Sequence, residues 1–213
     1  MAELVTKVQS YCKQLFESKL SEAFLYHNYH HTERVVDAAR IIGRESELSD
    51  EDLETVTLAA WFHDVGYTEG CNDHEETSAR IAKDFLQNED ISEARLNQVL
   101  GCILATRMPQ NPNNLLEEVL CDADMHHLAC TDYEKMSEKM HKEIELTKNK
   151  KMTKEEWVSL NHVFFKNHQY FTEFGKKYLQ PIKEDNLKMM GKRKKKSSDE
   201  KYVKKLEKKL EKL

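Results

Sequence analysis

Apolar residues recur three and four positions apart through most of the chain, and this spacing predicts helices. In the N-terminal segment the repeating positions are Leu4, Val5, Val8, Tyr11, Cys12, Leu15 and Phe16. A second helix is predicted from Thr32 to about Gly43. A third helix begins at a cap on Ser49 or Asp50, and its apolar positions continue to Phe62.

The helical pattern resumes after an expected loop at residues 66–73. Asp73 and Ser92 can each cap a helix, because their side-chain oxygens can accept backbone N–H groups. The stretch MPQNPNN predicts a turn, and another helix follows from about Asn114. Further amphipathic helices are predicted through Met140, Trp157 and Phe174, with Pro181 at the start of the last one. We therefore expect an all-α helical bundle.

Composition agrees with this fold class, since the chain of 213 residues holds only six Gly and three Pro. We expect a helical domain at residues 1–187, followed by a basic linker and a charged amphipathic helix at residues 188–213. In that last helix Val203, Leu206, Leu210 and Leu213 repeat at heptad-like spacing. Two heptads are too few to predict a coiled coil. A solvated tail and the start of a longer protein's next segment both remain open.

Basic and acidic residues are unevenly distributed along the chain. Residues 188–213 hold 12 Lys/Arg against 4 Asp/Glu, whereas the remainder holds 21 against 34. An acidic body disfavours nonspecific nucleic-acid binding. The five scattered cysteines lack zinc-finger spacing and indicate buried thiols in a reducing compartment. No apolar stretch approaches the length of about 20 residues that spans a bilayer, so we expect a cytoplasmic protein.

The segment LAAWFHDVGY at residues 58–67 contains the first candidate chemistry. Its apolar run predicts a buried helix face, yet it leads directly into His63 and Asp64. A cluster of histidines ends upstream at His31, and an Asp-Ala-Asp lies downstream in LCDADMHHL. Buried imidazoles and carboxylates are costly unless they are paired or bind a metal. A shared divalent cation would resolve that cost.

The order of these segments, YHNYHHT, AAWFHDVGY and CDADMHHL, resembles the HD-domain superfamily of metal-dependent phosphohydrolases. The resemblance covers the region 25–128 and implies an HD-domain helical bundle. It implies one divalent metal ion (Mn²⁺, Fe²⁺, Co²⁺, Ni²⁺, Zn²⁺ or Mg²⁺). The metal ligands that it implies are His31, His63, Asp64 and Asp124.

Other histidines and carboxylates in these segments leave alternatives open. His27 or His30 can replace His31 as the first ligand, although His31 has the fitting flank, Thr-x-x-Val-Val. Asp122 can orient a neighbour or remain an ordinary helix residue. His126 and His127 are not expected to be ligands.

His74 opens the segment HEETSARIA, which is similar to the helix that follows the His-Asp pair in several HD subfamilies. In dinuclear members this histidine binds a second metal together with later histidines. Here the later segment reads CILATRMPQNP and holds no histidine, so a complete dinuclear site is not expected. His74 can contact phosphate, assist proton transfer, partly hold a weak second ion or be structural.

Several further residues complete the predicted catalytic set around Asp64. Glu69 and Glu75 can each accept a proton from an attacking water. Arg107 can clamp a phosphate, because guanidinium groups match phosphate oxygens. For each of them an ordinary surface position is the competing interpretation. Arg34 and Thr106 are lesser candidates of the same kind.

The predicted function is metal-activated hydrolysis of a phosphate ester, as a phosphomonoesterase or phosphodiesterase. The resemblance favours a small phosphorylated substrate, above all a nucleotide, and no specific nucleic acid. A homo-oligomer is compatible with the sequence. The alternative is a sensor module that binds a nucleotide or second messenger with weak or no turnover. Such modules occur at the N-terminus of longer proteins, including ones attached to membranes.

Overall fold

The computed structural model describes residues 2–194, which contain nine α-helices, three short helical turns and no strand. The helices are α1 (Ala2–Lys19), α2 (Tyr29–Glu45), α3 (Asp50–Phe62), α4 (His74–Leu86), α5 (Glu93–Ala105), α6 (Leu115–Asp124), α7 (Tyr133–Thr147), α8 (Lys154–Asn167) and α9 (Gln180–Lys194). The short turns are η1 (Val65–Thr68), η2 (Met125–Ala129) and η3 (Gly175–Leu179). The all-α prediction is confirmed. None of the helices in this part of the chain is long and apolar enough to cross a membrane.

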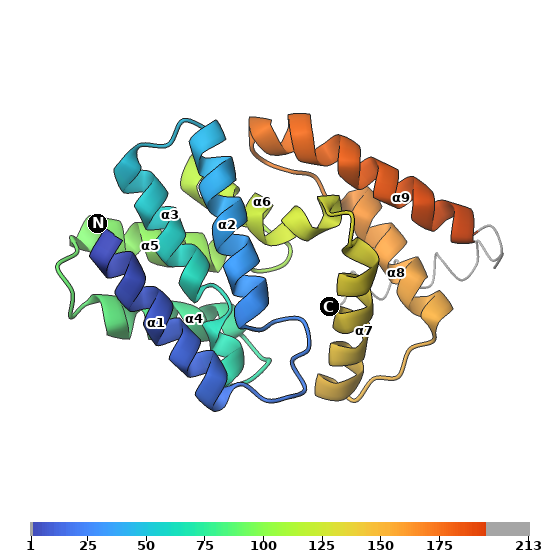
Figure 1. Ribbon diagram of the computed structural model, residues 1–213, viewed down its shortest axis with the longest axis horizontal. Helices are drawn as coiled ribbons and strands as arrows, with labels where there is room; N and C mark the ends of the chain where they lie inside the picture. Colours follow the sequence, from blue (N-terminus) through green and yellow to red (C-terminus); the bar gives the residue numbers. More distant parts are fainter. Residues whose placement is uncertain (1, 195–213) are drawn as a thin grey trace.

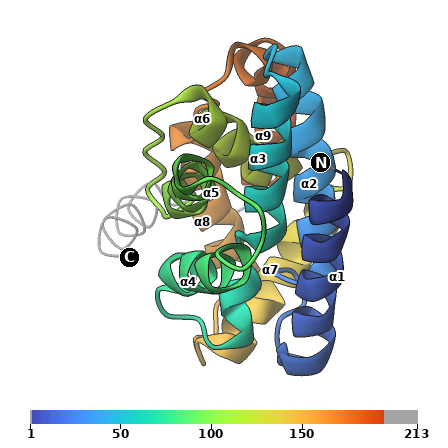
Figure 2. The same ribbon diagram turned by 90° about the vertical axis from the view of Figure 1, so that its left-hand side faces the viewer.

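Helix α3 is the centre of the larger core. Every residue from Glu54 to Phe62 is buried, because α1, α2, α5 and α6 all pack against this helix. Figure 1 shows α1 to α6 gathered in one half of the molecule and α7 to α9 in the other. In Figure 2 the first half faces the viewer, with α7 to α9 behind it. A helix covered on all sides needs no polar stripe. The continuous apolar run before His63 is therefore a consequence of this packing.

Two of the predicted helix caps are present, and Asn114, where a helix was predicted to begin, is a third cap. Ser49 accepts a backbone N–H at the start of α3, Ser92 does so at α5, and Asn114 does so at α6. Asp73 precedes α4 as predicted, but its φ of 47° is left-handed and its side chain accepts no cap hydrogen bond. That side chain instead lies 3.5 Å from Arg107.

Helix α2 begins at Tyr29, three residues earlier than predicted at Thr32. The reason is Asn28, whose side chain accepts hydrogen bonds from the backbone N–H groups of His30 and His31. This cap extends the helix backward into the histidine cluster. It places His31 in the first turn of α2, with its orientation fixed by the helix.

The C-terminal third of the described chain packs around a second, smaller apolar cluster. Its buried members are Met125, Leu128, Tyr133, Phe165, Tyr170 and Met190. Met190 lies beyond the predicted domain boundary at residues 187 and 188, and α9 continues without a break to Lys194. Residues 188–194 are therefore helical in the structure, where the sequence predicted a linker. The helix predicted from Val203 to Leu213 lies outside the described residues.

Asp122 on α6 joins these two halves. Its Oδ1 accepts a hydrogen bond from the backbone N–H of Phe171 at 2.8 Å. Its Oδ2 accepts from the backbone N–H of Thr172 at 3.0 Å and from the Thr172 hydroxyl at 2.7 Å. Burial raises the pKa of Asp122 to about 6, although the three donors oppose this shift. Asp122 is thus a structural anchor for the segment that precedes α9.

We expect Asp122→Ala to lower the free energy of unfolding by about 2–4 kcal/mol, because it leaves two buried N–H groups and a hydroxyl unpaired. Denaturant unfolding followed by circular dichroism measures this change. The matched control is Asp185→Ala, which removes an exposed carboxylate and should change stability by no more than about 0.5 kcal/mol. Equal stability of the two variants would contradict the anchoring role.

Candidate metal centre

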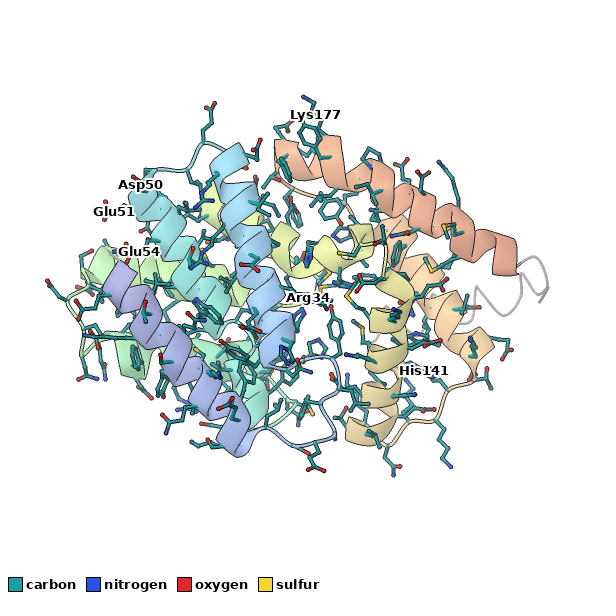
Figure 3. The ribbon with its side chains drawn as sticks, viewed as in Figure 1. Arg34, Asp50, Glu51, Glu54, His141 and Lys177 are labelled. Atoms are coloured by element: carbon teal, nitrogen blue, oxygen red, sulfur yellow. The ribbon has the colours of Figure 1, made fainter. Side chains whose placement is uncertain are left out.

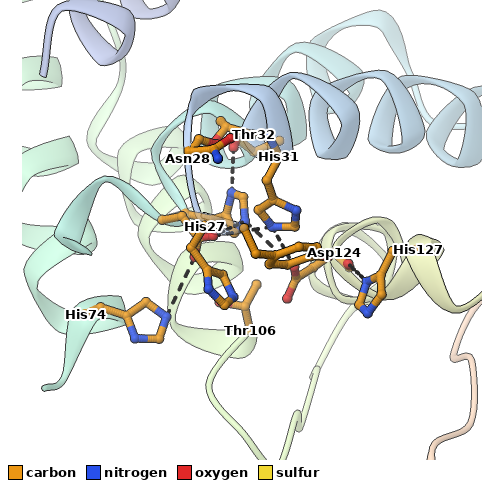
Figure 4. A network of polar contacts seen from close by, with 12 residues as sticks. His27, Asn28, His31, Thr32, His74, Thr106, Asp124 and His127 are labelled. Atoms are coloured by element: carbon orange, nitrogen blue, oxygen red, sulfur yellow. Dashed lines mark hydrogen bonds and ion pairs between the residues drawn. The ribbon is translucent and has the colours of Figure 1, made fainter. Parts of the chain in front are cut away.

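Four side chains meet at one point: His31 from α2, His63 and Asp64 from the turn after α3, and Asp124 from the end of α6. Figure 4 labels His31 and Asp124 at this point. His31 Nε2 lies 3.3 Å from Asp64 Oδ2 and 3.4 Å from Asp124 Oδ1. His63 Nε2 lies 3.3 Å and 3.8 Å from the same two oxygens. The ligand atoms of His31, His63 and Asp124 all lie within 4.8 Å of one another. The structure brings all four predicted ligands together, although 93 positions separate the first from the last.

The end of α3 explains how His63 is oriented. Its Nδ1 donates to the backbone carbonyl of Ala60 at 2.8 Å, which leaves Nε2 facing the cluster. Gly66 lets the chain turn immediately afterwards, because a Cβ at this position would lie 2.1 Å from the backbone oxygen of His74. The Gly66 N–H also donates to the Ser78 hydroxyl at 2.8 Å. The turn after the His-Asp pair is thus held against α4.

Three atoms of this cluster are buried without a hydrogen-bond partner: His31 Nε2, His63 Nε2 and Asp64 Oδ2. Unpaired buried polar atoms of this kind cost free energy, whereas coordination of a cation would satisfy all three. Imidazole nitrogens and carboxylate oxygens suit divalent transition metals and Mg²⁺. The donor set therefore fits a divalent metal ion.

Electrostatics inside the cluster favour positive charge. Burial opposes ionisation of His63, but the carboxylates of Asp64 and Asp124 outweigh it and raise the pKa of His63 to about 9. Burial also opposes ionisation of Asp64, yet the neighbouring histidines hold the pKa of this carboxyl well below its usual range. A bound cation would replace the proton on His63, because metal ligands must be deprotonated.

Of His27, His30 and His31, only His31 reaches the other three proposed ligands. His27 is directed instead to Glu143 on α7, whose carboxylate accepts from His27 Nδ1 and from the backbone N–H groups of Tyr26 and His27. His30 is exposed and lies 3.1 Å from Glu33. The geometry therefore selects His31 among the alternatives that the sequence left open.

His74 and Glu75 lie at the edge of the cluster. His74 Nε2 is 3.7 Å from Asp64 Oδ1, and its Nδ1 is 3.4 Å from the buried Glu75 carboxylate. The His74 ring stacks on Tyr67 with centroids 4.0 Å apart. Burial lowers the pKa of His74, although the two carboxylates oppose the shift. A neutral imidazole in this position can accept a proton, and once protonated it can donate one.

The structure does not bring Glu69 or Arg107 to the centre. Glu69 is exposed and pairs with Arg80 on α4. Arg107 lies outside the cavity and pairs with acidic residues around the start of α4, namely Asp73, Glu75 and Glu76. Both side chains already have partners at the surface, which corrects the roles predicted for them.

Two lesser candidates lie nearby. Arg34 projects from α2 toward α7 and lies 3.9 Å from Asp132 (Figure 3). Thr106 borders the same cavity as the ligands, but its hydroxyl donates to the Ile103 carbonyl at 2.8 Å. Neither side chain contacts the four clustered ligands in the structure.

Tyr26 is a functional candidate that the sequence pattern did not predict. Its ring is 3% exposed, its hydroxyl has no hydrogen-bond partner, and it lies 4.7 Å from the His31 ring between centroids. His127 donates from Nδ1 to the backbone carbonyl of Asp124 at 3.0 Å, and burial lowers the pKa of His127 to about 3. The only signal for Tyr26 was its place in a His- and Tyr-rich segment.

A cavity of about 300 Å³ opens beside the cluster and extends toward α7 and α8. Asp64 and Asp124 line it at one end, together with Tyr26, His74 and His127. These polar side chains therefore lie together at one end of a pocket that a small molecule can enter.

Comparison with known proteins identifies the domain that contains these ligands. The sequence profile of the HD domain matches residues 28–129. None of the curated protein sequences matches the chain significantly. The fold is similar to the crystal structure of a predicted HD superfamily hydrolase from an uncultured Thermotogales bacterium. That protein is 18% identical, with a TM-score of 0.57 over 90% of this chain and 89% of the other. Residues 28–129 therefore form a domain that belongs to the HD-domain superfamily, which includes metal-dependent hydrolases.

Proposed function

We propose that the protein is a metal-dependent phosphohydrolase that cleaves a small phosphate ester with an activated water. The observation that carries this proposal is the set of three buried, unpartnered ligand atoms on His31, His63 and Asp64 beside a cavity. Asp124 completes the donor set from α6. Buried polar atoms that have no hydrogen-bond partner within the protein are expected to bind a group from outside it.

His31, His63, Asp64 and Asp124 would hold the metal. A divalent ion bound by them would supply Lewis-acid activation of water and of a phosphoryl oxygen. The protein's own part is to hold these groups in place: the Ala60 carbonyl fixes the ring of His63, and the first turn of α2 fixes His31.

His74 is the residue best placed to move a proton. Its Nε2 faces Asp64 Oδ1, while Glu75 lies against Nδ1 and can orient the ring. A protonated His74 would donate to a phosphoryl oxygen or to the departing alkoxide. Asp64 Oδ1 can accept the proton of the attacking water. The unpaired hydroxyl of Tyr26 provides a second donor at the same end of the cavity.

We expect His31→Ala to lose bound metal and to lower turnover of phosphate esters by at least about 10³-fold, because it removes one of four ligands. His63→Ala and Asp64→Ala should behave alike. Metal content by mass spectrometry and hydrolysis of a phosphoester panel measure both effects.

The matched control is His30→Ala, which removes an exposed imidazole one position away in the same helix turn. It should retain metal and activity. If His31→Ala kept its metal and its turnover, the proposed centre would be wrong. Tight binding of a nucleotide by the native protein without any product would support the sensor module instead.

We expect His74→Gln to keep the metal but to lower kcat by about 10²–10⁴-fold, because it removes the proton-transfer group and leaves the four ligands. The test combines metal content with the dependence of kcat on pH, which should lose one ionisation. Loss of metal from this variant would show that His74 is a ligand rather than a proton donor.

A further inference from the structure

The cavity that begins at the metal ligands continues into an apolar space between α7, α8 and η2. We call this space the apolar chamber. Its walls are formed by Met125, Met140, Ile144, Met152, Leu160 and Phe164. These side chains come from η2, α7, α8 and the segment between α7 and α8, and most of them are only half-buried. An apolar wall that remains accessible from a catalytic centre is suited to the non-reacting part of a substrate.

The polar groups that also border the chamber are paired with one another. The Tyr133 hydroxyl donates to Asn161 Oδ1 at 2.8 Å, and Asn161 Nδ2 donates to the Trp157 carbonyl at 2.9 Å. The indole N–H of Trp157 donates to the Ser137 hydroxyl at 2.8 Å. A sugar or a nucleobase placed here would leave its own polar atoms unpaired or would have to break these bonds. An apolar group would do neither.

Charged groups are also kept away from the interior of the chamber. Glu143 on α7 is buried, but its two oxygens are occupied by His27 and by the backbone of Tyr26. Lys148 and Lys150 border the cavity, and both are exposed to solvent. Their charges therefore lie in the water at its edge, where they would attract an anionic ester during approach.

We propose that the chamber binds the alcohol part of the phosphate ester and that this part is a medium-sized alkyl or aryl group. This inference rests on the proposed phosphohydrolase function. The cavity of about 300 Å³ is at the small end of the range for ligand sites, so it accommodates one such group beside the phosphate. The substrate class is then apolar phosphate esters rather than nucleotides.

The test compares methyl, butyl, hexyl and octyl phosphate with adenosine monophosphate, using the full chain loaded with Mn²⁺. We expect kcat/KM to rise by about fourfold for each methylene group until the chamber is filled, because burial of apolar area favours binding. Hexyl phosphate should be a better substrate than the nucleotide. A flat series with measurable turnover would overturn the inference and leave the proposed function intact.

Two substitutions test whether the preference for longer alkyl phosphates arises in the chamber. Ile144→Trp fills the chamber from α7, and the ratio of octyl to methyl phosphate kcat/KM should fall by at least about tenfold. Leu146→Trp is the matched control, because Leu146 is on the same helix but is 60% exposed and does not line the cavity. Leu160→Trp fills the chamber from α8 and should act like Ile144→Trp. Thermal melts check that each variant is folded.

Binding measurements separate the failure of this inference from the failure of the proposed function. If no ester is hydrolysed, the phosphohydrolase proposal fails. Calorimetric titration of the metal-loaded protein with methylphosphonate and octylphosphonate then decides the inference. Tighter binding of octylphosphonate that is lost in Ile144→Trp and Leu160→Trp supports the chamber. Equal binding of both phosphonates overturns it.

Discussion

The structure depends on burying two imidazoles and two carboxylates at one point between α2, α3 and α6. Such groups are costly in a protein interior, and the cluster reduces the cost by mutual ionisation. The pKa of His63 is raised to about 9 and that of Asp64 is held low, so positive and negative charge face each other. Ligand atoms nevertheless stay unpaired, which makes the site receptive to a cation. The surrounding apolar core fixes the helices that carry them.

The parts of this arrangement that depend on local sequence could be predicted. Periodic apolar positions gave the helices, and Ser49, Ser92 and Asn114 mark real helix starts because capping involves only neighbouring residues. Asp73 is not a side-chain cap because its backbone is left-handed rather than extended, and its carboxylate lies beside Arg107 instead. The four proposed ligands were chosen because their order along the chain resembles a known family, and in the structure these side chains lie together at one point.

Side-chain partners beyond the ligands could not be predicted in the same way. Glu143 pairs with His27, which is 116 positions away in the sequence, and no local pattern predicts such a pairing. Glu69 was a reasonable base by its place near the His-Asp pair, yet the fold turns it toward Arg80. Met190 lies beside the run of charged residues that predicted a linker, yet it packs in the second core. Each of these outcomes was decided by tertiary neighbours.

The two halves of the molecule divide the work of the proposed site. All four ligands lie within residues 28–129, the region that matches the HD domain, whereas α7 and α8 lie beyond it. Most of the apolar chamber is built from those two helices and the segment between them. Substitutions there can reshape the space for the alcohol group without moving a ligand, since the ligand helices are held by a separate core. Asp122 connects the halves through its hydrogen bonds to Phe171 and Thr172. Loss of these bonds should therefore change the position of the chamber relative to the four proposed ligands more than it changes the ligands themselves.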